Sequence, residues 1–117
     1  RPGHTTMEGL LEACVAATRT PGTRLRWREP QQIARAEIEE WSELPLWIPP
    51  GHPMEGLLGM NTEHAHAAGL RCRPVAETVG DTWRWMSQLP GPPSLRADLT
   101  APGLPPAKEL VALHHAR

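Results

Sequence analysis

Apolar residues recur at helical spacing in several stretches of the chain, and prolines and glycines mark most of the boundaries between them. Thr5 and Glu8 fit a capping box, which predicts Thr5 as the N-cap of the first helix. Gly69 fits the end of a helix, and Pro74 fits the first position of the next one. The pattern predicts four or five helices, over about 6–18, 30–40, 62–68, 75–89 and 105–115.

The helix that follows Pro74 has the clearest apolar face. Val75, Val79, Trp83 and Met86 recur on one side of it, so we expect Trp83 to be a core residue. Trp85 lies about 200° around the same helix, where it would contact a different element or chain.

Two other stretches predict strands. Residues 23–27 alternate, with Leu25 and Trp27 on one side and arginines on the other. Leu57 to Met60 is a short apolar run after a turn. The predicted fold class is therefore α+β and mostly helical, with four or five helices and two or three short strands. This is too little sheet for a self-sufficient α/β domain, so we expect a subdomain packed on something larger.

The segment 41–50 is too rich in proline for a regular helix and too apolar for an ordinary exposed loop. We therefore expect most of it to pack against the rest of the chain. Leu46, Trp47 and Ile48, with Met54 after the next turn, are the candidate substrate-binding residues. Trp47 could equally pin the loop to the core, and both roles stay open.

Size and charge narrow the class of protein. The 117 residues allow one domain at most, and the formal net charge is −1 with both signs interspersed. Without a basic face, a nucleic-acid partner is not expected. No apolar run approaches the ~20 residues that span a membrane. Cys14 and Cys72 form no CxxC pair, and no signal peptide is apparent, so we expect a cytoplasmic protein with free thiols.

No familiar chemical motif is present. The sequence lacks GxGxxG and GxxxxGK[ST], and Gly56 with Gly59 makes only a GxxG. His64 and His66 are two apart, so on a helix they point to different sides, and no spacing matches a zinc site. Cys72 has no histidine-based dyad beside it. We therefore assign no catalytic, cofactor-binding or metal-binding residue in this chain.

Three consecutive segments carry a resemblance to a known family. They are residues 61–70, the Arg-Cys-Arg-Pro step at 71–74, and the run ETVGDTWRW at 77–85. In this order they resemble the C-terminal part of extended short-chain dehydrogenases/reductases, the NAD-dependent epimerase/dehydratase family. Residues 6–14, 41–49 and 103–114 are similar to neighbouring parts of that region. Asn61 stands where the family more often has Asp, and either residue can cap a helix.

The resemblance implies a substrate-binding subdomain that folds against a Rossmann domain. In the family, that domain binds NAD(P) and carries a Tyr-x-x-x-Lys pair. This chain has no Tyr and only one lysine, Lys108, so it cannot contain the pair. We therefore expect a C-terminal fragment that neither binds a cofactor nor catalyses alone. It would divide into a substrate-binding subdomain (1–89), a Pro-rich linker (90–106) and a tail helix (107–117).

The expected partners are the missing N-terminal Rossmann domain, or a partner chain that carries it, and a small-molecule substrate of the full enzyme. NAD(P) is the implied cofactor of that enzyme. The alternative is an independent helical module that binds another protein through its Trp-rich faces. The two readings differ in one physical respect: a subdomain leaves apolar surface exposed where the Rossmann domain would sit, whereas an independent module folds cooperatively alone.

Overall fold

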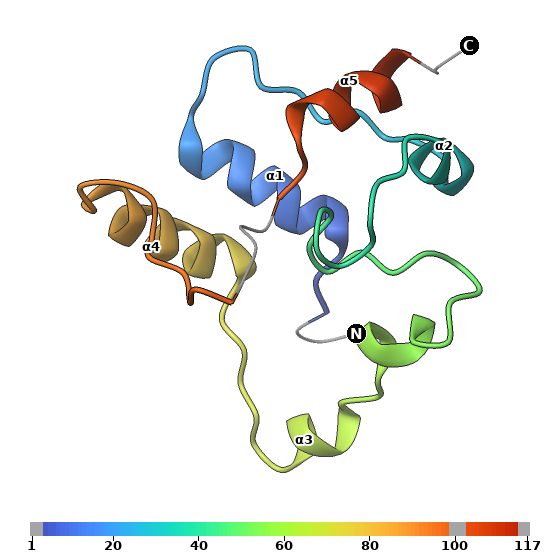
Figure 1. The fold of residues 1–117 in the computed structure, drawn as a ribbon. Helices are drawn as coiled ribbons and strands as arrows, with labels where there is room; N and C mark the ends of the chain where they lie inside the picture. The colour runs from blue at the N-terminus through green and yellow to red at the C-terminus, as the bar shows by residue number, and fades with distance from the viewer. Residues whose placement is uncertain (1–3, 99–102, 115–117) are drawn as a thin grey trace. The chain divides into compact units, whose positions relative to one another are not determined.

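The computed structural model describes residues 4–98 and 103–114, which form helices joined by irregular chain (Figure 1). No helix in these residues is long and apolar enough to cross a membrane. The chain divides into two compact units, each drawn from two stretches: 1–25 with 61–94, and 26–60 with 95–117. The elements are α1 (Met7–Thr18), α2 (Pro30–Arg35), the 3-10 helix η1 (Glu55–Gly59), α3 (Glu63–Ala67), α4 (Val75–Ser87) and α5 (Pro106–His114).

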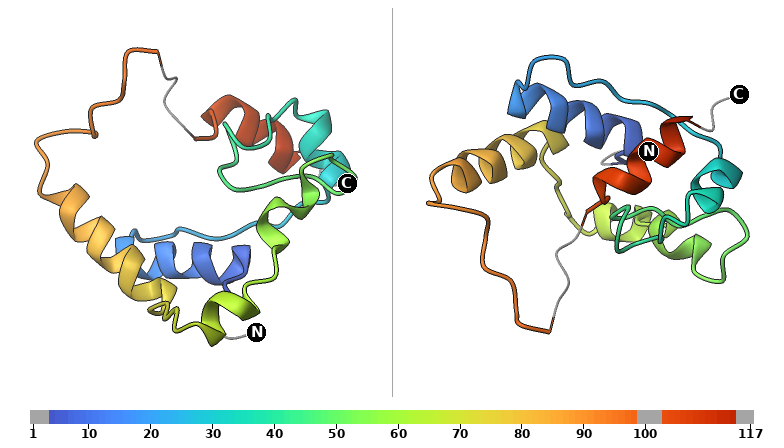
Figure 2. Two further views of the ribbon diagram at one scale, coloured as in Figure 1. Left: turned by 90° about the horizontal axis from the view of Figure 1, so that it is seen from below. Right: turned by 45° about the horizontal axis from the view of Figure 1, so that its top comes forward.

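The first unit is built on the contact between α1 and α4, which lie side by side in both views of Figure 2. α1 begins where the Thr6 hydroxyl accepts the backbone N–H of Gly9 at 3.1 Å. It ends at Arg19, which adopts the left-handed conformation. Neither α1 nor α4 contains a fully buried residue. The apolar faces of the two helices are therefore only partly withdrawn from water.

The second unit holds the small core of the described chain. Ala36, Ile38 and Ala112 are its buried residues, each 5–6% exposed. The partly buried side chains of Ile33, Leu44 and Leu104 pack against them. Because Ala112 lies on α5, the core joins the C-terminal helix to the chain that follows α2.

Polar contacts secure α5 at both ends. The Lys108 ammonium donates to the Glu37 carbonyl at 2.6 Å and to Glu43 Oε2 at 2.8 Å. At the other end, Arg28 Nε donates to the Ala112 carbonyl at 3.1 Å. The last carbonyls of a helix have no partner within the helix, so a guanidinium there satisfies them.

The prediction of an α+β fold is wrong, because the structure has no strand over residues 4–98 and 103–114. Residues 23–27 are irregular. An alternating pattern needs a second strand to take up its backbone hydrogen bonds, and none lies alongside in the described chain. The second predicted strand, Leu57–Met60, falls mostly within η1, where Leu57 N–H bonds to the Met54 carbonyl. An apolar run of four residues cannot distinguish strand from helix.

Smaller differences concern single residues. The N-cap of α1 is Thr6 and not Thr5, so the helix starts one residue later than the capping box predicts. Trp83 is 38% exposed and is therefore not one of the buried core residues of the described chain. Gly69 directly follows Ala68, the C-cap of α3, as predicted for a helix end, and has a φ of +107°.

Candidate functional site

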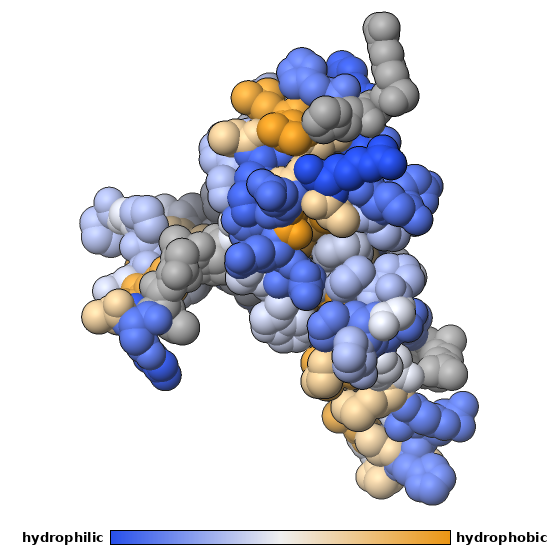
Figure 3. All heavy atoms as spheres, turned by 45° about the vertical axis from the view of Figure 1, so that its right-hand side comes forward, coloured by the Kyte–Doolittle hydropathy of each residue, from blue (hydrophilic) through white to orange (hydrophobic). Residues whose placement is uncertain are grey.

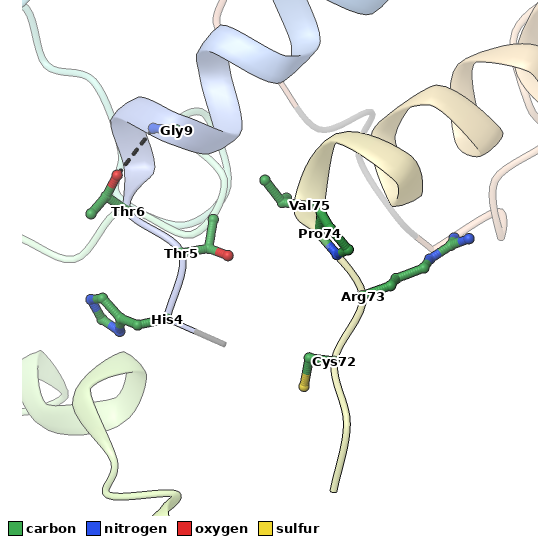
Figure 4. Close-up of a pocket in the computed structure, with 8 residues that line it drawn as sticks. All are labelled: His4, Thr5, Thr6, Gly9, Cys72, Arg73, Pro74 and Val75. Carbon is green, nitrogen blue, oxygen red and sulfur yellow. Dashed lines mark hydrogen bonds between the residues drawn. The ribbon is translucent and has the colours of Figure 1, made fainter. Parts of the chain in front are cut away.

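A cavity of about 430 Å³ lies in the first unit where α1 and α4 begin (Figure 4). Its walls come from the chain that enters each helix, so it combines residues about seventy positions apart in sequence. It is lined by His4, Thr5, Thr6, Gly9, Cys72, Arg73, Pro74 and Val75.

Two of the polar side chains that line this cavity, Thr6 and Arg73, are engaged elsewhere. The Thr6 hydroxyl caps α1. Arg73 turns away from the cavity (Figure 4), with Nη1 2.6 Å from Asp81 Oδ2 and Nε donating to Thr78 Oγ1. The Arg73 hydrogen bond, followed by that of Arg84, holds the pKa of Asp81 below its ordinary value. The Arg73 charge is therefore balanced within α4 and its entry.

Two reactive side-chain types remain at the cavity, the exposed Cys72 thiol and the His4 imidazole. No hydrogen bond joins them in the described chain, so no nucleophile–base pair is assembled there. The described residues of the cavity thus form no catalytic arrangement.

The predicted substrate-binding residues lie in the second unit and do not line this cavity. Leu46 and Met54 are exposed, at 42% and 50%, whereas Trp47 and Ile48 are half-buried. The expectation that most of segment 41–50 packs down is met by half of it, since five of its ten residues are exposed.

Hydrogen bonds between residues close in sequence hold this segment together. Trp41 N–H donates to the Trp47 carbonyl at 3.2 Å, and Trp47 N–H donates to the Leu44 carbonyl at 3.1 Å. In the next turn, Met54 N–H donates to His52 Nδ1 at 3.0 Å. The four predicted residues are thus set on two linked turns.

Sequence reasoning missed the residues of the α1–α4 cavity. The signals for both helix starts are present, in Thr6 and Pro74. What brings the two starts together is the packing of α1 on α4, which leaves no local trace in the sequence. For metals, the described residues contain no group of three or more His, Cys, Asp or Glu side chains that could hold an ion.

Comparisons with known proteins add no relative. No family model matches the chain, and neither the curated proteins nor the solved structures yield a match.

Proposed function

We propose that this chain is the substrate-binding subdomain of an NAD(P)-dependent epimerase/dehydratase or reductase, and that it works only against a Rossmann domain. The order of its segments, from residues 6–14 through 61–85 to 103–114, supports this proposal. The cofactor and the catalytic Tyr and Lys would come from the Rossmann domain. Such an enzyme would act in the cytoplasm.

The observation that carries the proposal is the imbalance between buried and exposed apolar residues. Three residues form the buried core, while Trp27, Trp85 and Met60 are more than half exposed. Figure 3 shows apolar side chains in orange and tan lying openly among hydrophilic ones in blue. Monomeric proteins rarely leave this much large apolar surface uncovered, and a missing domain would cover it.

In this proposal, Leu46, Trp47, Ile48 and Met54 contact the substrate. Leu46 and Met54 already face solvent, and Trp47 would form an apolar wall behind them. The chain's role is shape and selectivity, since it supplies no proton donor of its own at these positions.

A thermal melt of the isolated chain, with a dye that fluoresces on apolar surfaces, tests the proposal. We expect a broad transition and strong dye binding at low temperature, because the core is too small for a cooperative fold. A sharp transition without dye binding would support the independent interaction module instead.

The coding sequence on the 5′ side of Arg1 provides a second test. We expect it to encode a Gly-rich nucleotide-binding loop and a Tyr-x-x-x-Lys pair, in frame or displaced by a frameshift. If no frame contains either motif, and no co-expressed Rossmann domain suppresses dye binding by the chain, the assignment to this enzyme class fails.

A further inference from the structure

Six large apolar side chains between Trp41 and Met60, all in the second unit, are exposed. We call this set the 41–60 face. Its large side chains are all between 40% and 68% exposed. It comprises Trp41, Leu46, Met54, Leu57, Leu58 and Met60.

His52 lies between the turns that carry Trp41 and Met54. The His52 ring accepts the Met54 N–H at Nδ1, and its Nε2 lies 3.7 Å from Glu40 Oε1. Glu40 directly precedes Trp41, whose N–H is bonded to the Trp47 carbonyl. The ring of His52 therefore connects the turn that presents Trp41 with the turn that presents Met54.

The backbone is held in an unfavourable conformation where two of these side chains emerge. Trp41 has φ +64° and Leu46 has φ +67°, in the left-handed region that costs non-glycine residues about 1 kcal/mol or more. Strain of this kind persists where surrounding contacts impose it, and it is frequent at ligand-binding positions. Here it coincides with apolar side chains that point into solvent.

Charge distinguishes this face from the other exposed apolar residues. Residues 37–60 contain five glutamates and neither lysine nor arginine. Glu40 and Glu55 adjoin the apolar side chains of Trp41 and Met54 in sequence, and both are exposed. Glu43 is already paired with Lys108, so the acidity available to a partner centres on the other glutamates.

We propose that the 41–60 face docks a cationic amphipathic helix of a partner protein. Leucine and methionine side chains adapt to the apolar stripe of such a helix, and carboxylates at the rim pair with its lysines or arginines. A second copy of this face would bring like charges together, which opposes self-association. This docking role goes beyond the proposed function, and a bound helix would exclude substrate from Leu46 and Met54, because both occupants would cover the same two side chains.

Titration with a designed peptide tests the docking role. The probe is a peptide of about 18 residues with leucine at helical spacing and lysine elsewhere. A peptide with glutamate in place of lysine is its control. We expect saturable binding of the lysine peptide, measured by calorimetry and weakened by salt, and no binding of the glutamate peptide.

Matched variants locate the binding. The pair Glu40→Gln and Glu55→Gln keeps hydrogen-bonding oxygens and should weaken binding about three- to tenfold. The pair Glu8→Gln and Glu12→Gln removes the same charge from α1 and should leave binding unchanged. Likewise, Leu58→Ser should weaken binding, whereas Leu70→Ser in the first unit should not.

Three outcomes would overturn the docking role. They are the absence of saturable binding, equal weakening by both glutamine pairs, and self-association that Leu58→Ser abolishes. The last result would identify a second copy of the chain as the occupant. Circular dichroism of each variant keeps a loss of fold from being read as a loss of binding.

Discussion

Lys108 is the only lysine of the chain, and at the scale of single residues it makes the most consequential polar contact. Its ammonium group bridges the Glu37 carbonyl and the Glu43 carboxylate, both more than sixty positions away in sequence. The hydrogen bond from Lys108 and that from the Glu39 backbone N–H lower the pKa of Glu43 below its ordinary value of 4.5. The Lys108 ammonium thus helps to hold α5 against residues 37–43.

This contact predicts an acid sensitivity of the second unit. Because the folded-state pKa of Glu43 is lowered, its stabilisation is present above pH 4.5 and is lost as the pH falls through the folded value. Glu43→Gln should therefore lower the protection of α5 amides against hydrogen exchange at neutral pH and change this protection less at pH 3. The exposed pair of Arg96 and Asp98 provides the control, since Asp98→Asn should have little effect at either pH.

The cap of α1 gives a second prediction at this scale. Thr6→Ala removes the acceptor of the Gly9 N–H and should destabilise α1 by about 1 kcal/mol. Thr5→Ala should have almost no effect, because the Thr5 side chain does not cap the helix. Hydrogen exchange of the Gly9 amide distinguishes the two variants. If the Gly9 amide exchanges faster by the same factor in both variants, the two threonines share the cap or Thr6 does not supply it.

At the scale of elements, the helices of residues 4–98 and 103–114 meet in two places: α1 with α4, and α2 with α5. The α1–α4 contact is the more extensive one, but the buried residues lie beside the second, where Ile38, in the chain after α2, belongs to one cluster with Ala112 of α5. α2 has only six residues, so packing rather than intrinsic helix stability must hold it. The stability of α2 and α5 should therefore depend on the same few side chains.

Truncating the core tests this dependence. Ile38→Ala should destabilise α2 and α5 together by about 2–4 kcal/mol, because it leaves a cavity beside Ala112. Amide hydrogen exchange of both helices measures the effect. Leu95→Ala, at a position 46% exposed in the same unit, should change exchange very little. If only α2 is affected, α5 is held by its polar contacts and not by the core.

At the scale of the whole molecule, exposed tryptophan, leucine and methionine side chains far outweigh the buried core. A partner that buries these side chains would therefore stabilise the chain more than an internal rearrangement would. The proposed enzyme subdomain therefore carries a testable consequence for cofactor binding.

The isolated chain should not bind NADH. It has no Gly-rich phosphate-binding loop, and the part of it that the structure describes has no strand to precede one. NADH fluorescence should stay unchanged when the chain is added up to high micromolar concentration. Saturable enhancement of that fluorescence would mean that the chain binds a nucleotide by itself, contrary to the proposal that the Rossmann domain binds it.

Sequence reasoning located α1, α3, α4 and α5 to within a few residues because their ends carry local signals, such as Pro74 before α4 and Gly69 after α3. It extended the second helix to about residue 40, whereas α2 ends at Arg35. It failed for the strands, since an alternating pattern such as residues 23–27 becomes a strand only beside a partner. The exposure of Trp83 and the cavity at Thr6 and Cys72 also depend on packing between distant segments. Local patterns in the sequence do not predict that packing.

The interleaving of the two units has a consequence for biosynthesis. Arg28 and the carbonyl it binds on α5 are 84 positions apart, and the whole 61–94 stretch of the first unit is translated between them. At typical elongation rates, this delay is roughly 4 to 17 s. During this time Ile38 and its neighbours emerge from the ribosome without their partner helix. The nascent chain thus exposes apolar segments that chaperones can bind well before α5 is synthesised.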